Sequence, residues 1–172
     1  MRKLNLLKSF ISIFFLLQCI GIMAVLIFAV VILCQKGDLD FPININGNKV
    51  EIIDFPTKIA IIFVCFGYAA FVYGIYLFKQ ILELFALRII FDDRIINNFN
   101  KIGKAFVVAT VLTQIPIFIL KINGQKRDAD FNFTSGGFDS FLFTTGLALF
   151  FMVLSEVFKI AKNMKEENEL TV

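Results

Sequence analysis

Four long apolar stretches, separated by shorter polar segments, set the pattern of this chain. The first runs from Phe10 to Cys34, about 25 residues without a charge, whereas about 20 suffice to cross the hydrocarbon core of a bilayer. The others are Ile59 to Phe78, Phe106 to Leu120 with its flanks, and Phe141 to Phe158. The pattern predicts an all-α membrane protein with four transmembrane helices in an up-down bundle.

The first stretch has a second reading as a signal peptide. It is much longer than the apolar region of a signal peptide, and no small-x-small cleavage site follows it, so we expect an uncleaved helix. The third stretch is the least apolar because it contains Gln114 and Pro116. We expect a kink there, with the freed backbone groups satisfied by neighbouring helices.

Composition agrees with a lipid environment. Hydrophobic residues make up 58% of the 172 residues, above the roughly 45–50% of soluble domains, and 23 of the residues are Phe. The chain contains no His, the commonest general base and metal ligand. Its three cysteines are an odd number, which argues against a disulfide framework. The net charge of +3 is small and scattered, so we expect no direct nucleic-acid partner.

The distribution of Lys and Arg predicts the orientation. Eleven lie on the side of the two termini and the middle loop, and six on the other: Lys36, Lys49, Lys58, Lys121, Lys126 and Arg127. By the positive-inside rule the richer side is cytoplasmic, so we expect a multi-pass protein of the cell membrane with both termini on the cytoplasmic side. The predicted segments are 10–34 (first span), 35–57 (outer loop), 58–79 extending to about 91 (second span), 92–104 (cytoplasmic elbow), 105–122 (third span), 123–140 (outer loop), 141–160 (fourth span) and 161–172 (cytoplasmic tail).

The first outer loop carries a hairpin signal. Asn46-Gly47 lies between segments that alternate apolar and polar residues, and Asn-Gly accepts the positive φ angles of a tight turn. We expect a small extracytoplasmic β-hairpin that rests on the second outer loop or the membrane surface, either as a ligand-binding cap or as a structural lid. In the second outer loop, Asn132-Phe-Thr134 matches a glycosylation triplet, but we interpret it as loop.

The cytoplasmic elbow and tail hold most of the polarity outside the membrane. Asp92 or Asp93 can cap a helix on which Ile95, Phe99 and Ile102 recur on one face. This face fits either a partner or, more simply, the membrane surface or the extension of the fourth helix. The tail from Glu156 to Val172 continues the fourth helix into the cytoplasm.

Polar residues within the spans are few and uncharged, apart from Glu156 near the inner end. Lys159 follows three residues later, so we expect an ion pair, with a proton relay as the alternative. Gly67, Ala70 and Gly74 form a small-residue stripe suited to close helix packing. The remaining polar residues can hydrogen-bond between helices: Gln18, Tyr68, Tyr73, Thr110, Thr113, Gln114, Thr144, Thr145 and Ser155.

An enzyme is the least favoured class. No span contains an Asp, so an intramembrane aspartyl protease is excluded, and the missing His excludes Ser-His catalysis and zinc sites with His ligands. We expect no catalytic residue, no cofactor and no metal.

In the order of these features the chain resembles the DUF2975 family of small bacterial membrane proteins over nearly its whole length. The resemblance rests on FDDRIINNFNKIG at 91–103 and on the ending LSEVFKIAKNMKEENELTV at 154–172. It implies four spans with both termini inside. It also implies genomic proximity to short helix-turn-helix regulators and carries over no catalytic residue.

Two functions remain open. The first is a regulatory or accessory protein whose elbow and tail contact a soluble cytoplasmic partner, such as a small helix-turn-helix regulator. Its candidate contact residues are Arg88, Asp92, Asp93, Arg94, Glu156, Lys159, Lys162, Glu166 and Glu167. The alternative is a small transporter or channel subunit that works as a homo-oligomer. Its path would be lined by Gln18, Thr110, Thr113, Gln114 and Thr144. A purely structural lipid-binding or assembly factor is a third class.

Overall fold

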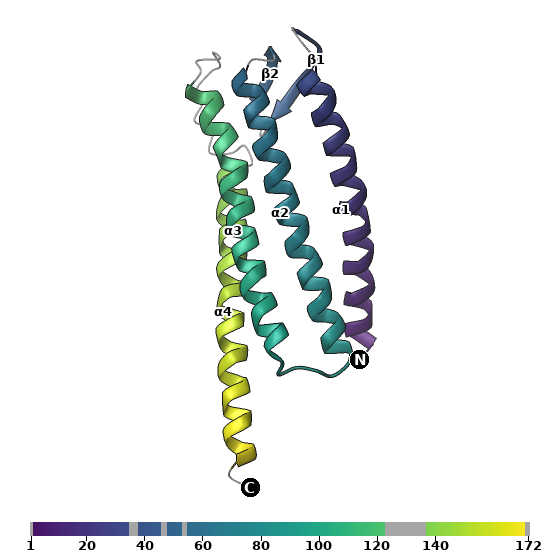
Figure 1. Ribbon diagram of the computed structural model, residues 1–172, viewed down its shortest axis with the longest axis vertical. Helices are drawn as coiled ribbons and strands as arrows, with labels where there is room; N and C mark the ends of the chain where they lie inside the picture. The colour runs from purple at the N-terminus through teal and green to yellow at the C-terminus, as the bar shows by residue number, and fades with distance from the viewer. Residues whose placement is uncertain (1, 35–37, 46–47, 53–54, 123–136, 171–172) are drawn as a thin grey trace.

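Four long helices in alternating directions make up most of the computed structural model (Figure 1). The helices are α1 (Arg2–Cys34), α2 (Phe55–Ala86), α3 (Asp93–Ile122) and α4 (Gly137–Leu170). The structure describes residues 2–34, 38–45, 48–52, 55–122 and 137–170, and the side chains of 3–34, 55–116 and 141–170. Because the directions alternate, α1 begins and α4 finishes at the same end of the molecule, and α4 extends furthest there (Figure 1).

Of the four predicted transmembrane helices, the described residues bear out three. Within them, three helices are long and apolar enough to cross a membrane: α1 from Lys3, α2, and α4 from Phe141. The helix α3 does not qualify, and the apolar end of the predicted third span, 117–122, lies outside the described side chains. Within the described side chains the apolar part of α3 runs only from Ala105 to Pro116, because the residues before it, from Asp93 to Lys104, are mostly polar. The three apolar helices make this a membrane protein.

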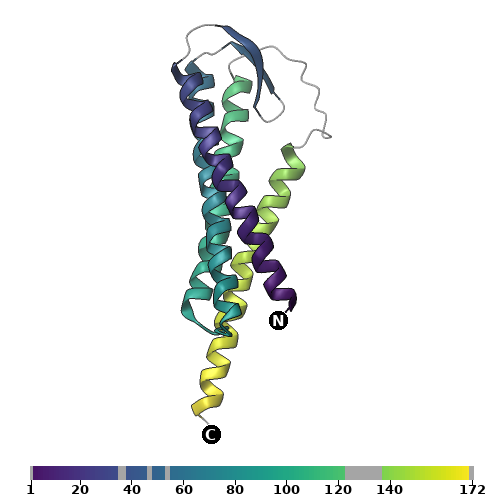
Figure 2. The ribbon, with the colours of Figure 1, turned by 90° about the vertical axis from the view of Figure 1, so that its right-hand side faces the viewer.

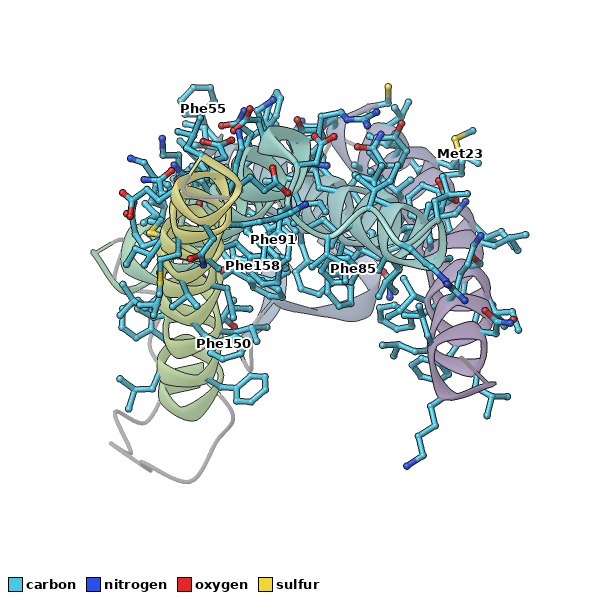
Figure 3. All side chains as sticks on the ribbon, turned by 90° about the horizontal axis from the view of Figure 1, so that it is seen from below. Met23, Phe55, Phe85, Phe91, Phe150 and Phe158 are labelled. Atoms are coloured by element: carbon cyan, nitrogen blue, oxygen red, sulfur yellow. The ribbon has the colours of Figure 1, made fainter. Side chains whose placement is uncertain are left out.

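The predicted up-down bundle takes the form of an open layer of helices. Extensive contacts join α1 to α2, α2 to α3 and α3 to α4, whereas α1 and α4 make none among the described residues. Figure 2 shows that α1 and α4 tilt in opposite directions relative to the two central helices. Viewed from below, they flank α2 and α3 and leave a space between them (Figure 3). The helix α1 therefore packs mainly against α2, and α4 packs mainly against α3.

A two-stranded antiparallel ribbon lies in the α1–α2 connection. It consists of β1 (Asp38–Ile45) and β2 (Asn48–Ile52), and Ile43 pairs with Val50. The ribbon makes no extensive contact with any helix in the described part of the chain, so the packed architecture is all-helical. The turn at 46–47 and the second outer loop, on which the ribbon was expected to rest, lie outside the described residues.

Phe side chains fill the contact between α2, α3 and α4. The core there is formed by buried residues that include Phe99, Phe106 and Phe151. The rings of Phe85 and Phe158 face each other at 5.8 Å and lie between the helices, whereas Phe150 points into the space between α4 and α1 (Figure 3). Close packing of rings in this way stabilises helix contacts without a charge, which suits a lipid environment.

Glycines set how closely the helices approach. A Cβ on Gly67 would lie 3.2 Å from the carbonyl oxygen of Ala109, and one on Gly74 would lie 2.5 Å from the Phe106 ring. Both contacts are between α2 and α3. The glycines of the small-residue stripe therefore make the close helix contact that was predicted, and the helix they contact is α3.

The second helix ends at Ala86, earlier than the predicted extension to about residue 91. Arg88 adopts a left-handed conformation with φ 61°, and the backbone N–H of Ile89 donates to the Leu84 carbonyl while that of Arg88 donates to Phe85. These two bonds form a Schellman motif, which terminates a helix by satisfying its last carbonyl groups. The turn that follows leads directly into α3.

Candidate functional sites

An ion pair joins the start of α3 to the extension of α4. Lys162 Nζ lies 2.7 Å from a carboxylate oxygen of Asp93 and 3.5 Å from one of Glu166. The Lys162 side chain is 21% exposed and Asp93 73% exposed, so the bond lies at the surface with its lysine against the protein. Two helical turns away, the Ser155 hydroxyl donates to the Ile96 carbonyl oxygen at 2.8 Å. The predicted elbow and tail therefore meet.

Asp92 caps α3. Its carboxylate accepts the Arg94 backbone N–H at 2.7 Å and also binds the Arg94 guanidinium at 2.9–3.0 Å. Side-chain and then backbone hydrogen bonds from Arg94 lower the pKa of Asp92 from 3.8 to about 2. A capping carboxylate satisfies an otherwise unpaired N–H group and favours the positive end of the helix dipole. Asp92 and Arg94 therefore fix where α3 begins.

An apolar groove of about 740 Å³ lies beside the ion pair, along the extension of α4. It is lined by Phe91, Ala161, Met164, Lys165, Asn168 and Glu169. The Lys165 ammonium lies 5.7 Å from the centre of the Phe91 ring, within the range of a cation–π contact. None of these six residues was among the predicted contacts. Positions 161, 164, 165 and 168 follow helical spacing, and that periodicity was the available signal.

The other predicted contact residues lie apart from this junction. Arg88 occupies the left-handed position of the α2–α3 turn and is exposed, as is Glu167 on α4. Glu156 and Lys159 are also exposed, and the ion pair expected between them is not formed. Because they lie three apart on one helix, only their side-chain conformations decide that pairing. Partner contact through any of these residues stays a prediction.

A second candidate site lies within the apolar part of the molecule. A cavity of about 490 Å³ is lined by residues of all four helices, and it includes Thr110, Thr113, Gln114 and Thr144. These are four of the five polar residues that the sequence suggested for a path. The fifth residue, Gln18, does not line the cavity. It accepts a hydrogen bond from the hydroxyl of Tyr68, and Tyr68 does line the cavity. This bond confirms the prediction that Gln18 and Tyr68 hydrogen-bond between helices. The place of Tyr68 in the cavity lining was not predicted, because spacing along the chain does not show which helix faces which.

Within the described residues, no group of three or more Cys, Asp and Glu side chains is placed to hold a metal ion.

The sequence profile of a family described as a protein of unknown function, DUF2975, matches residues 9–172. The chain belongs to the DUF2975 family. No curated protein and no solved structure matches it. Since the family description assigns no activity to DUF2975 proteins, the two candidate sites rest on their geometry alone.

Proposed function

We propose that this DUF2975 protein is a membrane-anchored regulatory or accessory protein that binds a soluble cytoplasmic partner through the α3–α4 junction. A small helix-turn-helix regulator is the specific candidate. The observation that carries the proposal is the groove beside the Asp93–Lys162 ion pair. It combines an apolar floor, including Phe91 and Met164, with charged residues at its edge.

The extension of α4 supports this proposal. Each helix has 30–34 residues, about 45–50 Å, whereas the hydrocarbon core is about 30 Å thick. The excess length projects into water, and α4 reaches beyond the other helices (Figure 1). On this extension Met164 is 59% exposed and Leu170 86% exposed. Apolar side chains on a projecting charged helix favour binding of a protein partner.

The proposal includes a topology. We place the protein in the bacterial inner membrane with four crossings and both termini in the cytoplasm. The excess of Lys and Arg on the side of the termini and the α2–α3 turn supports this orientation. The alternating helix directions support an even number of crossings.

Site-specific photocrosslinking in native membranes tests the proposal. A photoreactive benzoylphenylalanine replaces Met164 in the groove, and the same residue replaces Val153, which is similarly exposed at 60% but lies in the apolar part of α4. We expect one small soluble helix-turn-helix protein to be captured at position 164 and not at position 153. Equal capture at both positions, or only self-crosslinks and lipid adducts at 164, would contradict the proposal.

A charge exchange across the ion pair provides the matched control. Lys162→Asp and Asp93→Lys each place like charges together, whereas the double variant restores a pair of opposite charge. We expect each single change to reduce capture and the double change to recover it. If both single variants capture the partner as well as the natural protein does, the junction is not the docking surface.

The second candidate is a small transporter or channel subunit working as an oligomer. Convergence of Thr110, Thr113, Gln114 and Thr144 on one cavity favours it. Ion coupling argues against it, because none of the described residues that line the cavity is charged. Loss of transport in liposomes on changing Gln114→Leu would support this function over the first.

A further inference from the structure

The cavity of about 490 Å³ in the apolar part of the molecule lies where the helix layer is open. Its lining includes Val25 of α1, Val64 of α2 and Thr144 of α4. Because α1 and α4 make no extensive contact among the described residues, the space between them faces the surrounding lipid (Figure 3). Its volume is within the range of small-molecule sites, about 300–1,000 Å³. A lipid-soluble molecule can therefore enter sideways from the membrane.

Most hydroxyl groups of the cavity are already bonded within the protein. The Thr110 hydroxyl donates to the Phe106 carbonyl at 2.7 Å, and the Thr113 hydroxyl lies 3.0 Å from the Ala109 carbonyl. The Tyr68 hydroxyl donates to Gln18 Oε1 at 2.5 Å, and its oxygen retains the capacity to accept a bond. These bonds stabilise the cavity wall.

The side chain of Gln114 differs from these bonded hydroxyl groups. Its carboxamide lines the cavity, and within the described part of the chain it has no hydrogen-bond partner. In hydrocarbon an amide without a partner is costly, and acyl chains offer neither a donor nor an acceptor. To satisfy both the NH2 group and the carbonyl oxygen of Gln114, a ligand group must accept one hydrogen bond and donate another. A hydroxyl group does both.

We propose that this cavity binds an uncharged amphipathic lipid whose hydroxyl head group hydrogen-bonds Gln114 while its apolar body lies against Val25 and Val64. A charged head group is disfavoured because none of the described residues that line the cavity carries a charge to pair with it. The site is independent of the α3–α4 junction, so it does not rest on the proposed function.

Photolabelling in phosphatidylcholine nanodiscs tests the proposal with two probes that carry the same diazirine-bearing acyl chain. One is a diacylglycerol, which is neutral with one free hydroxyl, and the other is a phosphatidylglycerol, which is anionic. We expect the neutral probe to label peptides of α2 and α3 that line the cavity, and the anionic probe to label them weakly.

Two pairs of variants define the site. Val25→Phe fills the cavity, whereas Val31→Phe enlarges a side chain on the same helix that is 54% exposed. Gln114→Leu removes the carboxamide, whereas Gln80→Leu makes the same change at a glutamine that accepts a hydrogen bond from Asn98 outside the cavity. We expect Val25→Phe to abolish cavity labelling and Gln114→Leu to reduce it about fivefold, equivalent to about 1 kcal/mol. The two controls should label normally.

The detergent-induced unfolding of each variant, followed by circular dichroism, is compared first so that only folded variants are labelled. Absence of cavity labelling by the neutral probe, equal labelling by both probes, or labelling that survives Val25→Phe would each overturn the proposal.

Discussion

At the scale of single residues, the junction between α2 and α3 is determined by two polar side chains with separate tasks. Arg88 takes the left-handed conformation that terminates α2, a position usually held by Gly. Asp92 then caps α3 through the Arg94 backbone N–H. Both residues were predicted as partner contacts, and the structure gives each a local role in the chain path.

The Asp92 carboxyl should titrate at about pH 2, because the Arg94 hydrogen bonds favour its charged form. Since the folded pKa is below the ordinary value of 3.8, its contribution to folding is present above about pH 4 and is lost as the pH falls toward 2. Carboxyl carbon chemical shifts measured by NMR across this range give the pKa directly. The Arg94→Gln variant should return the pKa toward 3.8, and an unchanged value would rule out Arg94 as the cause.

At the scale of elements, the contact between α3 and α4 depends on a close backbone approach. A Cβ on Gly103 of α3 would lie 2.5 Å from Met152 Cγ and 2.8 Å from the Ala148 carbonyl oxygen of α4. The methionine can move, whereas the backbone carbonyl can move only with its helix. Gly103 therefore sets the spacing on which the Phe core and the Asp93–Lys162 pair depend.

Gly103→Ala should destabilise the protein by about 1–3 kcal/mol, the usual cost of overpacking. Gly146→Ala is the matched control, because no atom lies within 4 Å of the added Cβ and alanine favours the helix by up to about 1 kcal/mol. The measurement is reversible unfolding in mixed detergent micelles followed by circular dichroism. If the two variants unfold at the same detergent fraction, the α3–α4 approach is less tight than described.

At the scale of the whole molecule, the number of crossings decides on which side of the membrane the extension of α4 lies. Four crossings put the extension of α4 in the cytoplasm, whereas three crossings would put it outside. The natural Cys34 is exposed at the end of α1, so it reports the side of the membrane that α1 reaches.

Two single-cysteine proteins distinguish these topologies, one retaining Cys34 and one carrying Lys165→Cys with the natural cysteines replaced by Ser. Intact cells treated with a membrane-impermeant maleimide should be labelled at Cys34, and Lys165→Cys should react only after permeabilisation. Labelling of both Cys34 and Lys165→Cys in intact cells would indicate an odd number of crossings, and labelling of Lys165→Cys alone would indicate the inverted orientation.

Part of the fold and of the candidate sites was predictable from the chain. Apolar runs identify α1, α2 and α4 as spans, because burial in lipid requires an uninterrupted apolar helix. Helical spacing identifies Ile95, Phe99 and Ile102 as one buried face. The open arrangement of the helices could not be predicted in this way, because apolar residues satisfy lipid and protein equally well and their pattern does not show which helices touch.

The sequence by itself determined that this is a helical membrane protein of the DUF2975 family with polar groups concentrated on the elbow and tail. These properties follow from local composition and from the cost of exposing apolar chain to water. Only the tertiary structure decided that Lys162 meets Asp93, that Tyr68 bonds Gln18, and that Gln114 faces a cavity. Such pairs lie far apart in the chain, so the packing of the helices, which spacing does not specify, brings them together.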